Sequence, residues 1–150
     1  MALTTSDTPY PATTRNFWLG IAAYLVPTFP IAFAWHLVLF ESRYHALGIY
    51  RDDPIIPFGL ASMIVQGAIF SWVFPRVFSG QRGSVLRNGL LFGLGAGLLS
   101  WSFTTLAVAA KQPMASISDY VLLETGFTVL QFLVVGPLTA LAHRTSGMVR

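Results

Sequence analysis

The chain has 150 residues, of which 54% are hydrophobic and only 10% are charged, and its mean hydropathy is +0.63. These values exclude an ordinary soluble domain of this length and indicate one compact unit. The absence of cysteine excludes disulfides, thiolate metal sites and thiol nucleophiles. The formal charge of +3 comes from basic residues placed singly at segment ends, a pattern that indicates membrane topology rather than a nucleic-acid partner.

Four stretches of mostly apolar residues fill the chain almost from end to end. They cover residues 17–40, 55–78, 88–110 and 120–142. Each is long enough, at about 1.5 Å per residue, to cross a hydrocarbon core of roughly 30 Å. We therefore predict an all-α, polytopic membrane protein whose transmembrane domain, residues 17–143, is a bundle of four transmembrane helices. Residues 1–16 and 144–150 are predicted to be polar tails.

The basic residues divide unequally between the two sides of the predicted bundle. The tails and the second loop carry Arg15, Arg76, Arg82, Arg87, Arg144 and Arg150, and the first and third loops carry Arg43, Arg51 and Lys111. Because basic residues are enriched in cytoplasmic loops, both termini are predicted to face the cytoplasm. The first and third loops are then outside.

The first span contains Pro27 and Pro30 near its middle. Each proline removes a helix hydrogen bond and clashes with the preceding turn, so the sequence predicts a kinked or locally unwound helix. The freed carbonyls should face Thr28, water or other helices rather than lipid. Alternatively, the prolines are tolerated with no function attached, as in other membrane helices.

The third span carries Gly89, Gly93 and Gly97 at four-residue spacing. One face of this helix therefore has almost no side-chain volume, and another helix can approach it closely. The pattern predicts helix packing, either within the bundle or between two protomers.

The two halves of the chain show a weak internal correspondence at an offset of 65 or 66 residues. The matched pairs are Trp35 with Trp101, Asp53 with Asp119, and Gln66 with Gln131. Two repeated helical hairpins of equal orientation would be related by a pseudo-two-fold axis along the membrane normal. The alternative is coincidence between two hairpins of equal length.

Several short segments together suggest a family. They are residues 40–50, residues 59–67, Pro75-Arg76, residues 107–111, and Glu124 with Gln131. This set resembles a group of small four-span bacterial membrane proteins classified as a domain of unknown function, and the resemblance covers most of the chain after Phe17. It implies a four-helix fold in the bacterial inner membrane, and it carries over no activity, cofactor or catalytic residue.

Inserting an ionisable side chain into the membrane costs about 2.5 to 3.5 kcal/mol for Asp, Lys or Arg at a helix centre. Each such residue therefore requires an explanation. His36 and Glu124 each lie about four residues, roughly 6 Å, below the outer ends of their spans and are expected to meet. Thr104 lies slightly deeper, and Lys111 is expected to bend its stem toward Glu124. These residues predict an outer polar cluster.

Deeper in the bundle, Gln66 and Gln131 each lie about 11 residues, roughly 16 Å, from the outer ends of their spans. Glu124, Thr128 and Gln131 share one helix face, and Gly59, Ser62 and Gln66 share another. We interpret the two stripes as a hydrated pathway or ligand pocket between the second and fourth spans, with Glu124 accepting a proton or cation beside His36. The alternative is interhelical hydrogen bonding that serves packing alone.

Other chemistries find little support in the sequence. His36, His45 and His143 are not matched in depth, so neither a metal nor another cofactor is expected. No hydrolase motif is present, and an enzyme is the least favoured class. Tyr44 and Tyr50 are expected only to anchor the helices at the membrane interface.

Two function classes are favoured ahead of an enzyme. The first is binding or permeation of a proton, cation or small polar solute through an intramembrane polar cavity, by a homo-oligomer packed through the glycine face. The second is an accessory or structural subunit of a larger membrane complex. In that class Glu124 and His36 only pair with each other, and the glycine face docks onto a membrane protein partner.

Overall fold

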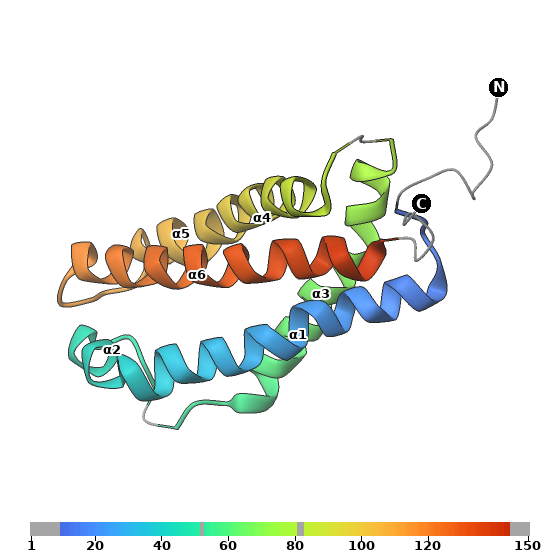
Figure 1. Ribbon diagram of the computed structural model, residues 1–150. Coiled ribbons are helices and arrows are strands. Elements are labelled where there is room, and N and C mark those ends of the chain that lie inside the picture. Colours follow the sequence, from blue (N-terminus) through green and yellow to red (C-terminus); the bar gives the residue numbers. More distant parts are fainter. Residues whose placement is uncertain (1–9, 52, 81–82, 145–150) are drawn as a thin grey trace.

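Four long helices run side by side and make up most of the computed structural model, which describes residues 10–51, 53–80 and 83–144 (Figure 1). They are α1 (Thr14–Ala34), α3 (Ile56–Phe78), α4 (Val85–Trp101) and α6 (Ile117–His143). Helix α1 continues through the π-helical segment η1 (Trp35–Leu39), and α4 continues through the π-helical segment η2 (Ser102–Leu106) and α5 (Ala107–Ala109). The short helix α2 (Glu41–Leu47) lies in the first loop. The predicted all-α bundle of four spans is confirmed.

The ends of these helices follow from local sequence signals. The side chains of Thr13, Ser84 and Ser116 each accept a hydrogen bond from the backbone N–H three residues later, at the starts of α1, α4 and α6. Gly48 ends α2 with a φ of 75°, a left-handed conformation that glycine adopts without strain. The predicted tails lie only partly within the described residues, because residues 1–9 and 145–150 fall outside them. Contrary to the prediction, residues 10–16 are not simply a tail, since Tyr10 is buried and α1 already begins at Thr14.

The first span is not unwound at its prolines. Helix α1 is one α-helix through Pro27 and Pro30, so this part of the prediction is wrong. Between the prolines, Thr28 is buried and lies 3.5 Å from the Gln131 side chain of α6, which holds this turn against a neighbouring helix. The irregular segment comes later, at η1, where the helix widens to the π form.

The glycines of α4 pack against α6 of the same chain. A Cβ placed on Gly93 would lie 2.5 Å from the carbonyl oxygen of Phe132, and one placed on Gly89 would lie 2.5 Å from the Cα of Pro137. The backbones are therefore in close contact, and the predicted packing role of Gly89, Gly93 and Gly97 is confirmed. Of the two predicted alternatives, the structure therefore shows the contact within the bundle, because α6 occupies this face.

Helices α1 and α6 together form the middle of the bundle, and α1 packs beside α6. Helix α1 also packs along α3, while α6 also packs along α4, and α3 and α4 touch only over a short stretch. One of the residue pairs matched in the sequence, Trp35 with Trp101, occupies similar positions in the two halves. A π-helical segment begins at Trp35 in the first half and at Ser102, directly after Trp101, in the second. The two-fold relation is incomplete, since α3 and α4 do not reproduce the long contact between α1 and α6.

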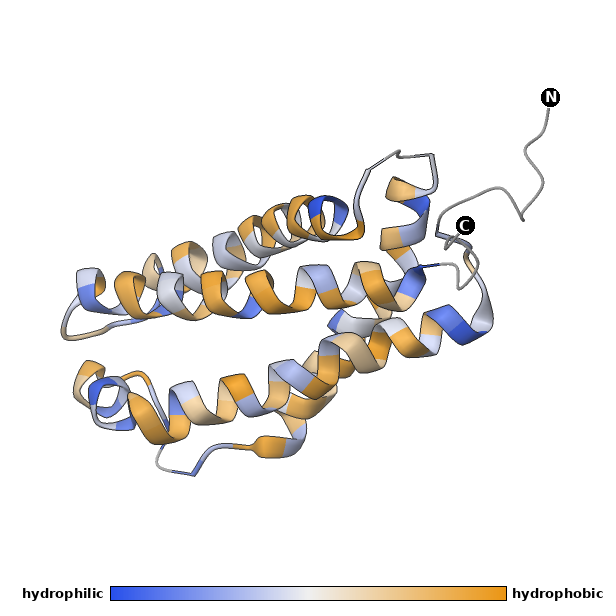
Figure 2. Ribbon diagram, viewed as in Figure 1, coloured by the Kyte–Doolittle hydropathy of each residue, from blue (hydrophilic) through white to orange (hydrophobic). Residues whose placement is uncertain are grey.

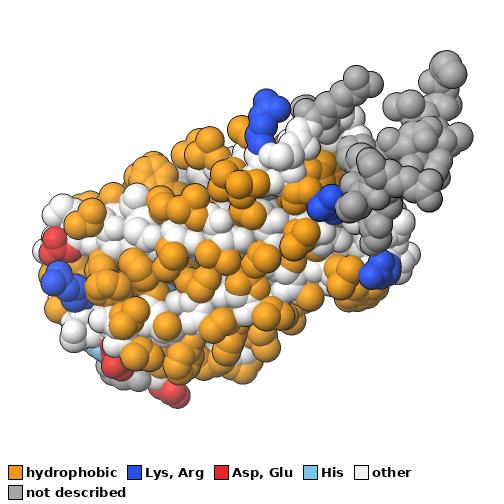
Figure 3. All heavy atoms as spheres, in the orientation of Figure 1, with side chains coloured by type: hydrophobic (Ala, Val, Ile, Leu, Met, Phe, Trp, Pro, Cys, Tyr) orange, Lys and Arg blue, Asp and Glu red, His pale blue; other side chains and the backbone are white. Residues whose placement is uncertain are grey.

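The molecule has an apolar outside and a partly polar inside. Orange residues dominate the long helices in Figure 2, and on the face shown in Figure 3 the charged side chains lie toward the two ends. Leu94 and Leu122 are 70% and 74% exposed, although both are leucines of the spans. The buried polar residues of the spans are Asn16, Thr28, Ser71, Asn88, Thr105, Glu124, Thr128, Gln131, Thr139 and His143. This arrangement is that of a multi-pass membrane protein, whose surface faces lipid.

Candidate functional site

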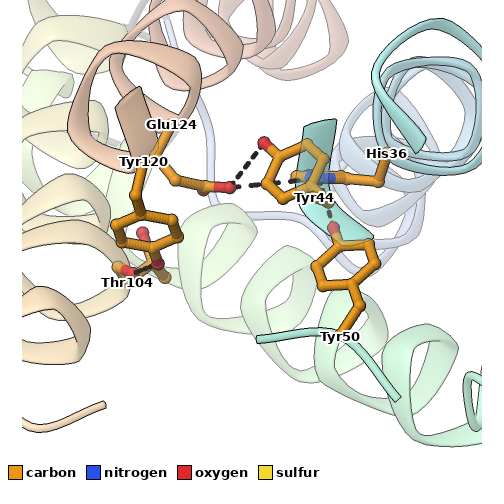
Figure 4. Close-up of polar contacts among 6 residues, drawn as sticks. All are labelled: His36, Tyr44, Tyr50, Thr104, Tyr120 and Glu124. Atoms are coloured by element: carbon orange, nitrogen blue, oxygen red, sulfur yellow. Dashed lines mark hydrogen bonds and ion pairs between the residues drawn. The ribbon is translucent and has the colours of Figure 1, made fainter. Parts of the chain in front are cut away.

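Four polar side chains from four different segments meet at the end of the bundle that carries α2, which we call the loop end (Figures 1 and 4). They are His36 of η1, Tyr44 of α2, Tyr50 of the first loop and Glu124 of α6, and we call them the loop-end cluster. Glu124 is only 8% exposed and Tyr44 is fully buried. The cluster therefore places an ionisable carboxyl group inside the protein.

Two hydrogen bonds and one longer polar contact connect the members of the loop-end cluster into one chain. The Tyr44 hydroxyl donates to Oε1 of Glu124 at 2.7 Å, and Nδ1 of His36 lies 3.9 Å from the same oxygen. The same nitrogen, Nδ1 of His36, is 2.6 Å from the Tyr50 hydroxyl. The contact between His36 and Glu124 confirms the prediction made from their depth in the spans.

Aromatic rings enclose these groups. The rings of Tyr44 and Tyr50 stack with centroids 4.6 Å apart and an interplanar angle of 12°, and the His36 ring lies 4.5 Å from that of Phe127. Burial raises the pKa of the Tyr44 and Tyr50 hydroxyls above the ordinary tyrosine value, and the nearby Glu124 raises both further. Tyr44 therefore keeps its proton and remains a hydrogen-bond donor to Glu124.

The first loop folds back over the bundle to build the cluster. The left-handed turn at Gly48 ends α2 after Leu47, and the Leu47 carbonyl accepts a hydrogen bond at 3.1 Å from the Ala115 N–H of the third loop. Tyr44 and Leu47 pack with Tyr120 in a buried apolar group. These contacts hold α2 above the end of α6, so that Tyr44 reaches Glu124.

Two residues predicted for this cluster do not join it. Thr104 is exposed, and its hydroxyl donates to the Ser100 carbonyl of its own helix at 3.0 Å. Only its backbone carbonyl faces inward, where it accepts from the Tyr120 hydroxyl at 2.6 Å (Figure 4). Lys111 is exposed, and within the described residues the basic side chain found within 4.0 Å of the Glu124 carboxyl group is that of His36. The expected contact between Lys111 and Glu124 is therefore wrong, because the lysine stem stays at the surface.

A second polar group lies near the middle of the spans and is centred on Tyr24 of α1. The Tyr24 hydroxyl donates to Oε1 of Gln66 and accepts from Nε2 of Gln131 at 3.1 Å. Gln66 also donates to the Ser62 hydroxyl at 3.1 Å. We call Tyr24, Thr28, Gln66 and Gln131 the mid-span network.

The position of the mid-span network differs from the polar pathway that the sequence predicted between the second and fourth spans. Gln66 and Gln131 come together, as their equal depth predicted, but Tyr24 of α1 stands between them. The polar residues therefore line a seam among α1, α3 and α6. Thr128, predicted beside Gln131, is buried but lines a groove between α4 and α6.

A third polar group joins the same three helices at the other end of the bundle, which we call the terminal end. The Ser71 hydroxyl of α3 donates to the Phe17 carbonyl of α1 at 2.7 Å and lies 3.0 Å from Nε2 of His143. The side chain of Asn16 donates to the His143 carbonyl at 3.4 Å. Within the described residues, the Thr139 hydroxyl and Nδ1 of His143 are buried without a hydrogen-bond partner.

Sequence reasoning missed Tyr24 and gave Tyr44 and Tyr50 only an anchoring role. That role is wrong for Tyr44, whose ring is buried and whose hydroxyl binds Glu124. One signal was present for Tyr24, because it lies four residues before Thr28 and therefore on the same helix face.

Two grooves open on the sides of the bundle. One, of about 490 Å³, lies between α4 and α6 and is lined almost entirely by apolar side chains, together with Thr125 and Thr128. The other, of about 350 Å³, lies between α1, the first loop and the start of α3, and His36, Tyr50 and Arg51 line one part of it. The loop-end cluster is thus reached from the second groove through His36.

The described part of the chain contains no group of three or more His, Asp or Glu side chains close enough to hold a metal ion. No family model matches the chain, and neither the curated proteins nor the solved structures contain a match. The resemblance to a four-span family therefore stays a prediction, and the function has to be argued from the geometry of the site.

Proposed function

We propose that this protein binds protons at Glu124 and passes them along the seam among α1, α3 and α6. The observation that carries the proposal is a buried carboxyl group in hydrogen-bond contact with Tyr44 and 3.9 Å from His36, which itself lines a groove at the surface. A carboxyl group inside a membrane span must be paired, hydrated or protonated, and the neighbouring His36 is a second group that can take up or release a proton.

Further support comes from the stacking of polar groups along one seam. On α6, Gln131 lies seven residues, about 10 Å, from Glu124, and His143 lies twelve residues, about 18 Å, beyond Gln131. Between the last two, the buried Thr139 hydroxyl has no protein partner within the described residues. Buried polar atoms of this kind are positions that internal water satisfies, and water can link the three polar groups.

The geometry favours a proton over a larger polar solute. Both grooves of the described structure have mainly apolar walls, and most polar side chains of the seam are already hydrogen-bonded within their own group. A hydrated solute would lose its water without gaining comparable partners, whereas a proton moves between hydrogen-bonded groups without needing an open cavity.

The membrane and orientation belong to the same proposal. The excess of basic residues in the tails and second loop supports a cytoplasmic location of both termini, and the family resemblance suggests the bacterial inner membrane. In this orientation the loop-end cluster faces the outside, and Glu124 receives protons through His36 from the external side.

The test is proton flux into proteoliposomes that contain a pH-sensitive dye and are held at a fixed membrane potential. Glu124→Gln is expected to reduce the protein-dependent flux at least tenfold, because the amide accepts the Tyr44 hydrogen bond but does not carry a proton. Asp119→Asn is the matched control, since Asp119 is an exposed acid on the same helix. Equal flux in the wild type and in Glu124→Gln would overturn the proposal.

A further inference from the structure

The groove beside the loop-end cluster has two chemically different parts. His36, Tyr50 and Arg51 line it at the loop end, whereas Phe29, Phe33 and Met63 line it deeper along α1 and α3. Ligand sites commonly have volumes of about 300 to 1,000 Å³, and this groove, at about 350 Å³, lies at the small end of that range. The groove therefore has a cationic side chain, Arg51, and polar groups at the loop end, and apolar walls deeper along the helices.

We infer that this groove binds a single-chain amphiphile with a carboxylate headgroup, that is, a fatty acid entering from the lipid. The carboxylate would lie beside Arg51, at the end of the groove that His36 and Tyr50 also line, and the acyl chain would lie between α1 and α3. Arginine suits this role because its guanidinium group binds carboxylates with two parallel hydrogen bonds.

The size of the groove favours one acyl chain over two. At roughly 30 Å³ for a group the size of a water molecule, about 350 Å³ holds about a dozen such groups. A medium-length chain fills this space, and the side of the groove that is open to lipid leaves room for a longer tail. A phospholipid with two chains would leave one chain outside the groove.

The position of Gly59 gives the proposal a direct structural test. Gly59 lines the groove on α3, and a Cβ added there would meet no atom within 4 Å. Gly59→Leu should therefore fill the groove without disturbing the packing of the helices. Gly95 of α4 is equally open and lies away from this groove, so Gly95→Leu is the matched control.

The experiment uses decanoate with a photoreactive diazirine at the tail, added to the full-length protein in nanodiscs of zwitterionic lipid, with crosslinks mapped on peptides. Labelling is expected on residues 29–37 and 55–63 and should be blocked by excess decanoate but not by decanol or decyltrimethylammonium. Gly59→Leu should abolish this labelling, and Gly95→Leu should leave it unchanged. Arg51→Gln should weaken it roughly tenfold or more, with recovery in Arg51→Lys.

Three results would overturn the inference. They are labelling spread evenly over the lipid-facing helices, equal competition by decanol and decyltrimethylammonium, and persistence of the groove labelling in Gly59→Leu. Competition by phosphatidylglycerol without competition by decanoate would also overturn it, because the groove would then belong to a two-chain phospholipid.

Only the pH dependence of this binding rests on the proposed function. An anion beside His36, Tyr50 and Arg51 also lies near Glu124, Tyr44 and Tyr120, so proton uptake by the cluster should tighten decanoate binding by reciprocal linkage. Binding should then strengthen as the pH falls while decanoate is still ionised, and Glu124→Gln should remove this dependence but retain binding. If decanoate binds specifically in the groove but with the same pH dependence in the wild type and in Glu124→Gln, only the proton proposal is contradicted. If groove-specific binding is absent but the proton flux is normal, only the groove assignment is contradicted.

Discussion

The two long helix interfaces of this bundle, which we call seams, are held together by different kinds of interaction. Between α4 and α6, glycines bring two backbones into contact and the interface is largely apolar. Among α1, α3 and α6, the contacts include Tyr24 with two glutamines and Ser71 with His143. Because lipid tails are as apolar as leucine, close packing and interhelical hydrogen bonds are the two main ways to hold helices together in a membrane. The interface between α4 and α6 relies mainly on the first, with one hydrogen bond from Trp101 to Thr125, and the interface among α1, α3 and α6 relies more on the second.

The largest effect is expected on the glycine seam. In Gly93→Leu the new side chain would collide with the Phe132 backbone, and overpacking of this kind costs typically about 1 to 3 kcal/mol, and more where backbone cannot move. Unfolding in mixed detergent, followed by circular dichroism, measures the change. Gly95→Leu provides the comparison, because a Cβ at Gly95 meets open space and stability should be unchanged. Equal loss in both variants would contradict the account of this seam.

The next largest loss of stability is expected at the loop-end cluster, in the variant Tyr44→Phe. This change removes the hydroxyl that donates to Glu124, and a hydrogen bond to a charged group contributes about 1.5 to 3 kcal/mol. A double-mutant cycle with Glu124→Gln isolates the part of the contact that depends on the carboxyl group, and the effect of Tyr44→Phe should be clearly smaller in the Gln background. Purely additive losses would show that the carboxyl group binds the Tyr44 hydroxyl no better than an amide does.

A smaller loss of stability is expected when the mid-span network is changed. Tyr24→Phe disconnects Gln66 from Gln131, and interhelical hydrogen bonds in membranes contribute about 0.6 to 2 kcal/mol. The same unfolding measurement applies. Ser62→Ala serves as the control, since Ser62 is exposed and contacts only one member of the network. A Tyr24→Phe protein as stable as the wild type would remove the distinction between the two seams.

The smallest effects are expected at the two predicted site residues that the structure leaves outside the cluster. Thr104→Val and Lys111→Met alter exposed side chains, and such changes usually stay within about 0.5 kcal/mol. Both should also keep the proton flux of the wild type. A tenfold loss of flux in Lys111→Met would show that the lysine takes part in the site after all.

The sequence was informative where depth in the membrane decides the outcome. Counting residues from the span ends was enough to bring His36 near Glu124 and Gln66 level with Gln131, because the helical rise is constant. It could not show that Tyr24 would lie between the two glutamines, since that depends on how α1 is rotated and on the reach of a long side chain.

Other features depended on tertiary contacts that a pattern does not specify. A stripe such as Gly89, Gly93 and Gly97 accepts any close helix, so the choice of α6 over a second protomer was not encoded in the stripe itself. Tyr44 looked like an interfacial residue, because its burial results from the fold of the first loop and not from its place in a span.

The central claim is that Glu124 is a buried, proton-exchanging group inside the bundle. Infrared difference spectroscopy across a pH titration of the reconstituted protein tests it most directly. The account predicts a carboxylic-acid carbonyl band that titrates, is absent in Glu124→Gln, shifts in Tyr44→Phe and is unaffected by Asp119→Asn. A spectrum in which no titrating carboxyl band depends on Glu124 would contradict the claim.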